Sequence, residues 1–213
     1  MVMVMIALSA FVSAEQCAIQ PNADGHVDIP ANWTKIDANA FYECATLKSI
    51  SFKGNLVETI DAYAFYNTGL VSLTLPSSLT MIARYAFYKN EYLKTLTIPD
   101  GVATIDLGAF ALCSSLKEVT IPGSVKTLGS MAFSSCTSMT MVTIDDGVTG
   151  ISASCFASCT SLLTVSLPNS LTTIAMQSFQ GCVSLDTVDI PDSVTVIGVS
   201  AFMNCIALKS VTI

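Results

Sequence analysis

The stretch AFALCSSLKEVTIPGSVKTLGSM (109–131) decides the fold, because its pattern recurs along most of the chain. It begins beside Phe110, and matching phenylalanines follow one another at intervals of 22–24 residues. They are Phe41, Phe65, Phe87, Phe110, Phe133, Phe156, Phe179 and Phe202. A fixed period of this length is the signature of a repeat protein. One unit cannot bury its own apolar residues, whereas stacked units bury them against each other, so the sequence predicts a solenoid.

Within one unit, the apolar residues indicate a short strand. Val119 and Ile121 alternate with Glu118 and Thr120, which is the period-two pattern of a strand with one buried face. Pro122 follows directly, and proline ends the pairing because it has no backbone donor. Equivalent strands of stacked units should align as one long parallel sheet. A coil of this length leaves little room for a helix, so we expect an extended or 3₁₀ return path.

The two ends of the chain differ from the repeats. Residues 1–14 are apolar and end in small residues, as a secretory signal peptide does, and they are too few to span a bilayer. A misplaced start or a buried strand is the alternative interpretation of this segment. Residues 15–26 are expected to form an N-terminal cap over the first coil. Residues 27–213 make up the solenoid of about eight units. Because the sequence stops at Ile213 on a strand, we expect a truncated chain from which the C-terminal cap is absent.

The repeated pattern AFxxCxxLxxVTIPxxVTxIGxx resembles the BspA-like leucine-rich repeat across residues 27–213. The resemblance implies a right-handed solenoid of the α/β type, dominated by β-structure. It places a parallel sheet on the concave face and an extended or 3₁₀ path on the convex side. It also implies a secreted or cell-surface microbial protein that works in adhesion or protein recognition. Departures such as Thr68 and Asn90 in place of Cys do not alter the expected fold.

A column of cysteines lies three residues after the phenylalanines, at Cys44, Cys113, Cys136, Cys159, Cys182 and Cys205. Side chains of stacked coils project in parallel at about 5 Å, farther apart than the ~3.8 Å between Cβ atoms that a disulfide prefers. Thr68 and Asn90 occupy the same position, and like Cys they are compact and can bond a backbone carbonyl. We interpret the column as a buried ladder. Cys17 lies outside the column, and two interpretations of it stay open, a cap disulfide with Cys44 and a free thiol.

The composition and motifs argue against catalysis, cofactors and nucleic acid. A net charge of −7 provides no basic face for nucleic acid. His26 is the sole histidine, and Cys155 with Cys159 is the only close cysteine pair, too few ligands for zinc. Asp145 and Asp146 are expected to form a turn. We therefore expect no enzyme activity, no cofactor and no metal, and no apolar run is long enough for a transmembrane segment.

The outward positions of the predicted strands form a double column rich in small hydroxyls. This candidate partner-binding surface of the concave face consists of Ser49, Ser51, Ser72, Thr74, Thr95, Thr97, Glu118, Thr120, Met141, Thr143, Thr164, Ser166, Thr187 and Asp189. Thr suits an exposed strand through β-propensity alone, so the pattern also has a purely structural interpretation. An ice-binding face would need a flat, uninterrupted array, and Glu118 and Met141 interrupt this one.

Two hypotheses for the function follow. In the first, an exported or cell-surface protein without enzymatic activity binds a protein or glycan through its concave face. In the second, the solenoid is a structural spacer of a surface or wall. The signal-like start and one candidate glycosylation site, Asn32 in Asn32-Trp33-Thr34, favour export.

Overall fold

The computed structural model describes residues 17–212, so the predicted signal segment 1–14 lies outside the described residues. Strands alternate along the chain between longer and shorter ones. The longer strands are β1 (His26–Ile29), β3 (Ser49–Phe52), β5 (Ser72–Thr74), β7 (Thr95–Thr97), β9 (Glu118–Ile121), β11 (Met141–Ile144), β13 (Thr164–Ser166), β15 (Thr187–Asp189) and β17 (Ser210–Thr212). The shorter ones are β2 (Lys35–Ile36), β4 (Thr59–Ile60), β6 (Met81–Ile82), β8 (Thr104–Ile105), β10 (Thr127–Leu128), β12 (Gly150–Ile151), β14 (Thr173–Ile174) and β16 (Val196–Ile197).

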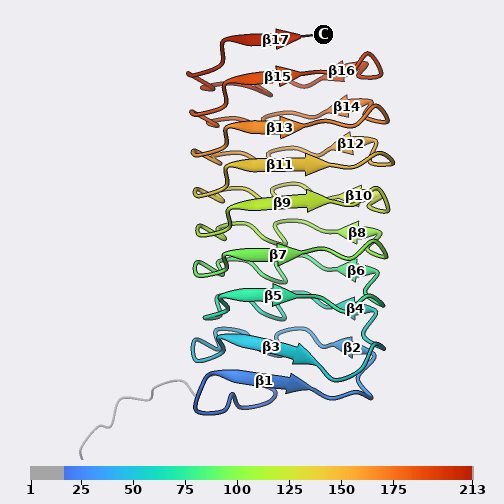
Figure 1. Cartoon of the computed structure of the whole chain (residues 1–213), viewed down its shortest axis with the longest axis vertical. Coiled ribbons are helices and arrows are strands. Elements are labelled where there is room, and N and C mark those ends of the chain that lie inside the picture. The colour runs from blue at the N-terminus through green and yellow to red at the C-terminus, as the bar shows by residue number, and fades with distance from the viewer. Residues whose placement is uncertain (1–16, 213) are drawn as a thin grey trace, which may run out of the picture.

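The longer strands stack one above another in chain order and run parallel (Figure 1). Between β9 and β11, Val119 stands opposite Val142 and Ile121 opposite Ile144, so equivalent repeat positions are in register. Along β9 the burial alternates between exposed and buried residues. The strand and its buried face are therefore as the repeat pattern predicts. The expected single long sheet is not formed over the described residues, because hydrogen bonding divides the longer strands into four parallel sheets, β1–β3, β5–β7, β9–β11–β13 and β15–β17.

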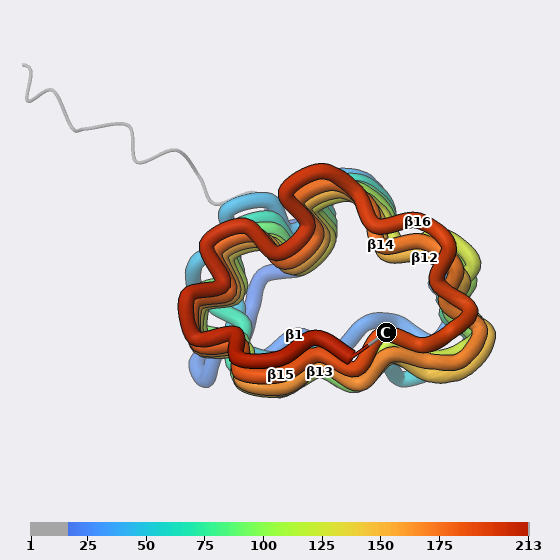
Figure 2. Tube along the Cα trace, turned by 90° about the horizontal axis from the view of Figure 1, so that it is seen from above, coloured from blue at the N-terminus to red at the C-terminus, as the bar shows by residue number. Residues whose placement is uncertain are grey.

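The shorter strands form a second parallel stack on another side of each coil, and turns make up the rest (Figure 2). Over residues 17–212 the regular structure is β-strand, with no α-helix or 3₁₀-helix. The helical part of the expected α/β class and the expected 3₁₀ return are thus not found in this range. The coils also rise with little curvature in both views, so the expected concave face is not evident.

The core is a column of stacked phenylalanine rings. Successive rings from Phe41 to Phe202 have centroids 5.0–5.6 Å apart and lie within 11° of parallel. Phe133, for example, is fully buried and stacks on Phe110 at 5.3 Å and on Phe156 at 5.6 Å. The repeat period brings each ring over the ring of the coil before it, so the column buries aromatic surface that a single unit would expose.

Each phenylalanine sits at a corner of the coil where left-handed (positive φ) and ordinary backbone conformations alternate. The residues two before and two after it have positive φ, as at Met131 (55°) and Ser135 (61°) on either side of Phe133. The N–H groups of these three residues donate to the next coil, for instance Phe133 to the carbonyl oxygen of Cys155 at 2.9 Å. A left-handed non-glycine residue costs about 1 kcal/mol or more, and these inter-coil hydrogen bonds offset that cost.

Candidate functional site

The outward side chains of the longer strands form one surface, which we call the long-strand face. All the predicted binding residues lie on it: Ser49, Ser51, Ser72, Thr74, Thr95, Thr97, Glu118, Thr120, Met141, Thr143, Thr164, Ser166, Thr187 and Asp189. Most are exposed, and Ser49, Ser51 and Thr143 are half-buried. Because equivalent residues pair across neighbouring strands within each sheet, as Ser72 with Thr95 does, the side chains follow two columns along the stack.

The long-strand face extends beyond the predicted set at its N-terminal end. His26 and Asp28 of β1 stand opposite Ser49 and Ser51 of β3 and so continue the two columns. The sequence interpretation left His26 out because it assigned residues up to 26 to the cap, and it left out Asp28 because it began the columns at Ser49, in the first complete unit. A signal was present, since the segment around Asp28 has the same Val-Asp-Ile-Pro order as residues 188–191.

These first two strands carry a hydrogen-bonded polar cluster. The Asp28 carboxylate accepts hydrogen bonds from Ser51 at 2.5 Å and pairs with Lys53 at 3.0 Å and His26 at 2.9 Å. The hydrogen bond from Ser51, followed by those from Lys53 and His26, lowers the pKa of Asp28 to about 2. A depressed pKa means that these interactions are complete above the ordinary value of 3.8 and are lost as the pH falls through about 2.

The same cluster links a serine, a histidine and an aspartate, which the sequence did not predict. Ser49 Oγ lies 2.8 Å from His26 Nδ1, and His26 Nε2 lies 2.9 Å from Asp28. Acyl transfer also needs free backbone donors for the oxyanion. The N–H of Ser49 instead donates to the carbonyl oxygen of Gly25 at 3.2 Å. We therefore interpret the cluster as polar packing that orders the N-terminal end of the face.

The cysteine column is a hydrogen-bonded ladder, as predicted. Each free thiol of the column donates to the carbonyl oxygen of the phenylalanine one coil back, for example Cys136 to Phe110 at 3.3 Å. Asn90 performs the same task with its amide, which donates to Phe65 at 2.7 Å, and Thr68 donates to the Asn90 side-chain oxygen. The column thus satisfies buried backbone carbonyls.

The cysteine ladder should be chemically inert in the folded protein. Burial raises the pKa of Cys113 and of Cys159 to about 12, and it raises that of Cys136 as well. We expect these thiols to react with Ellman's reagent at pH 8 at least 100-fold more slowly in the native protein than in urea. The half-buried Cys205 should react first. Fast reaction of the buried thiols in native protein would contradict the ladder.

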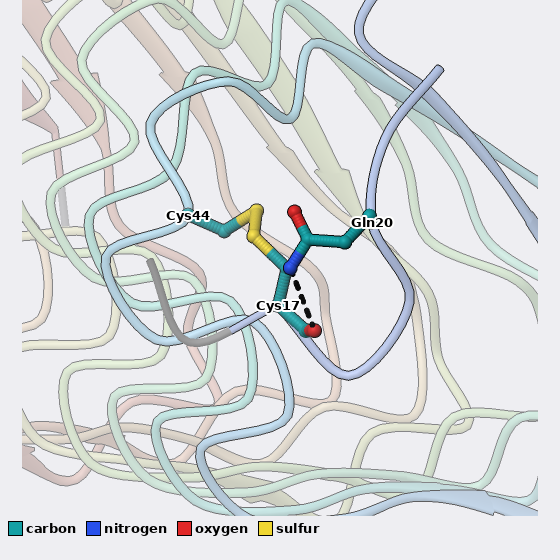
Figure 3. Close-up of a disulfide and its surroundings, with 3 residues drawn as sticks. All are labelled: Cys17, Gln20 and Cys44. Atoms are coloured by element: carbon teal, nitrogen blue, oxygen red, sulfur yellow. Dashed lines mark hydrogen bonds between the residues drawn. A yellow bond between two sulfur atoms is a disulfide. The ribbon is translucent and has the colours of Figure 1, made fainter. Parts of the chain in front are cut away.

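The alternative left open for Cys17 is resolved by a disulfide to Cys44, which ties the N-terminal segment to the first coil (Figure 3). The Gln20 side chain adds a hydrogen bond to the carbonyl oxygen of Cys17 at 3.5 Å.

Within residues 17–212, no group of three or more His, Cys, Asp or Glu side chains is arranged to hold a metal ion. A search of the same range finds no helix long and apolar enough to cross a membrane.

Two further predicted positions lie on the surface. Asn32 is exposed in the turn after β1, where a glycan would have room, and its glycosylation stays a prediction. Asp145 and Asp146 are exposed in the turn after β11. The carbonyl oxygen of Asp145 accepts a hydrogen bond from Val148 at 3.4 Å, which closes the turn that was expected there.

Comparison with known proteins places this geometry in a family. The family model described as the BspA type leucine rich repeat region matches residues 21–140 and 129–213. A search of curated proteins finds no match.

Solved structures of bacterial leucine-rich repeat proteins resemble the chain. A leucine-rich cell-surface protein of Faecalibacterium prausnitzii is 27% identical with a TM-score of 0.55, covering 88% of this chain and 59% of its own. The pneumococcal vaccine antigen PcpA is 26% identical with a TM-score of 0.52, and the match covers 88% of this chain and 61% of PcpA. The leucine-rich repeat protein TpLRR of T. pallidum is 25% identical with a TM-score of 0.67, and the match covers 87% of this chain and 78% of TpLRR. The chain thus spans about three fifths of the length of the first two.

Proposed function

The chain belongs to the BspA-type leucine-rich repeat family, and we propose that it is a non-enzymatic binding protein of the cell surface that holds a partner protein on its long-strand face. The observation that carries the proposal is the pair of exposed, in-register columns of small hydroxyls. Solenoids of this kind commonly present an extended surface of aligned strands to their partners.

The chemistry of the long-strand face favours recognition by hydrogen bonds and shape. Its middle part, from β5 to β13, carries one charged outward residue in the two columns, Glu118, and one large apolar one, the exposed Met141. Small hydroxyls on strands lose little conformational entropy when they bind, because the sheet already fixes their backbone. A partner with a flat polar surface or an extended segment fits such columns.

Surface location is the second part of the proposal. It is supported by the apolar segment 1–14, by the exposed Asn32 sequon and by the cell-surface protein among the structural neighbours. The Cys17–Cys44 disulfide adds support, because disulfides persist in oxidising compartments such as the exterior of the cell.

The proposal is tested by one substitution at the centre of the face. We expect Thr120→Arg to weaken binding to the partner at least tenfold, because a long cation replaces a small hydroxyl within one of the two columns. The free energy of unfolding should change by only a few tenths of a kcal/mol, since Thr120 is exposed. Binding is measured by surface plasmon resonance against an array of purified extracellular-matrix proteins and defined glycans.

The matched control is Thr127→Arg, which places the same exposed substitution on the shorter strand β10 of the same unit. It should leave binding unchanged. Equal binding by both variants, or no protein bound by the wild type, would overturn the proposal and favour a structural spacer. Binding to glycans alone through Thr120 would instead identify a glycan as the partner of this face.

A further inference from the structure

Tyrosines form two short columns at the corners of the first coils. Tyr42, Tyr66 and Tyr88 each follow a core phenylalanine, and their rings stack with centroids 4.8 and 5.1 Å apart. Tyr63 and Tyr85 stand two residues before a core phenylalanine and stack at 5.3 Å. The columns touch each other, with Tyr85 edge-on to Tyr88 at 5.5 Å. Together they make a wall of aromatic rings along several coils.

Both columns end at the next coil, where the equivalent residues have no ring. Ala111 stands at the position of Tyr88, and Gly108 stands at that of Tyr85. A Cβ at Gly108 would approach Cε1 of Tyr85 to 2.5 Å, so the Tyr85 ring already packs on this glycine. Over Ala111, in contrast, no ring continues the stack. One face of Tyr88 is therefore left without the ring that the periodicity would supply.

A pocket of about 430 Å³ opens at this break. This tyrosine pocket is lined, among others, by Tyr66, Tyr85, Tyr88, Ala111, Ser134 and Ser135. Its volume lies within the range of small-molecule sites, about 300–1,000 Å³. It is built from corner residues and shares no residue with the long-strand face, so a ligand here would be independent of the function proposed above.

The lining determines which ligand chemistry fits. All its side chains are uncharged, and the aromatic wall meets the hydroxyls of Ser134 and Ser135. The lining has no carboxylate to pair with a cation, and Arg84 and Lys89 adjoin Tyr85 and Tyr88 in the chain. A neutral ligand is therefore favoured over a cationic one. It needs one flat apolar face for the ring and hydroxyls around its edge for the serines.

We propose that the tyrosine pocket binds one pyranose unit of a neutral glycan. The C–H face of the sugar replaces the missing ring and stacks on Tyr88, while its hydroxyls exchange hydrogen bonds with Ser135 and the tyrosine hydroxyls. The Ser134 hydroxyl donates to the carbonyl oxygen of Ala157 at 3.2 Å, so it serves the sugar as an acceptor. Stacking on an aromatic face supplies apolar contact, and the hydroxyl pairs orient the sugar. The break in the columns at Ala111 thus creates a subsite of ring size.

Saturation-transfer NMR with the full chain tests the proposal, using methyl glycosides of glucose, galactose, mannose and N-acetylglucosamine as probes. We expect transfer to the C–H protons of one face of at least one sugar. Tyr88→Ala should raise its Kd at least tenfold, and Tyr88→Phe should retain most of the affinity because it keeps the ring. Tyr92→Ala is the matched control, since Tyr92 is exposed and lies outside the pocket lining.

A second variant keeps the test decisive if Tyr88→Ala disturbs the corner. Ala111→Tyr should continue the stack of Tyr42, Tyr66 and Tyr88, fill the pocket and abolish binding while raising or preserving the thermal unfolding midpoint. Absence of transfer to every sugar, or equal transfer to wild type and Ala111→Tyr, would overturn the proposal. Saturation transfer to a proline-rich peptide and to none of the sugars would also overturn it and would assign the pocket to peptides. Thr120→Arg should leave the sugar signal unchanged, which separates this test from that of the long-strand face.

Discussion

Phe133→Ala is expected to lower the free energy of unfolding by about 3–5 kcal/mol, the usual range for removing a large aromatic ring from a core. Phe133 is fully buried and lies between two rings, at 5.3 Å from Phe110 and 5.6 Å from Phe156. The truncation removes both stacking contacts and leaves a cavity in the middle of the column, where neighbouring coils hold the backbone in place. Urea unfolding followed by circular dichroism measures the effect.

Phe202→Ala provides the comparison at the end of the described column. Phe202 is half-buried and stacks on one ring, Phe179, at 5.4 Å, so its truncation should cost less than half as much. Thr120→Ala, on the long-strand face, should change stability by only a few tenths of a kcal/mol. If Phe133→Ala and Phe202→Ala were equally destabilising, the rings would contribute separately and the stacked column would not be the core.

The strands could be predicted because their signal is repeated in every coil. Val119 and Ile121 face inward in one unit, and Val142 and Ile144 do so in the next, in register. Period-two alternation fixes which side of a strand is buried, and the 23-residue spacing determines which strands lie together. The same alternation identified the outward columns around Thr120 without any structural information.

The corners could not be predicted in the same way. Tyr63, Met131 and Ser135 adopt φ of 60°, 55° and 61°, although none is a glycine or an asparagine, the residues that adopt this conformation most readily. Their conformation is maintained by hydrogen bonds to the following coil, such as Ser135 N–H to the carbonyl oxygen of Ala157 at 2.8 Å. Such bonds depend on a partner 22 residues away, and local propensity does not report them. A 3₁₀-helix needs negative φ at successive residues, and the positive φ values at these corners interrupt such a run, so the expected 3₁₀ path is not found there.

The tyrosine pocket was missed because it depends on a difference between coils. Pattern analysis emphasises what the repeats share, and the pocket exists because Ala111 does not share the ring of Tyr88. Aligning the residue after each phenylalanine would have revealed three tyrosines in succession followed by alanine. The contact between His26 and Ser49 was missed for a different reason: the two residues are one repeat period apart, but His26 had been assigned to the cap rather than to the first coil.

Removal of the Cys17–Cys44 disulfide should be the second large effect on stability. The bond closes a loop with a sequence separation of 27 residues, for which chain entropy predicts about 3–4 kcal/mol. Cys44 is also fully buried and occupies the first position of the cysteine column. In Cys17→Ala/Cys44→Ala, we therefore expect the segment before β1 to detach and the unfolding midpoint in urea to fall. Circular dichroism measures the midpoint, and hydrogen exchange measures the detachment.

Reductant separates this bond from the other thiols. Because the remaining six cysteines are free, a phosphine reductant should lower the stability of the wild type toward that of the double variant and leave the double variant unchanged. Alkylation in urea should label six thiols before reduction and eight after it. A wild type that is indifferent to reductant, or that presents eight thiols without it, would show that Cys17 and Cys44 are unbonded. The segment before β1 would then be attached to the first coil only through other contacts, such as the hydrogen bond from Ala18 N–H to the carbonyl oxygen of Ala40.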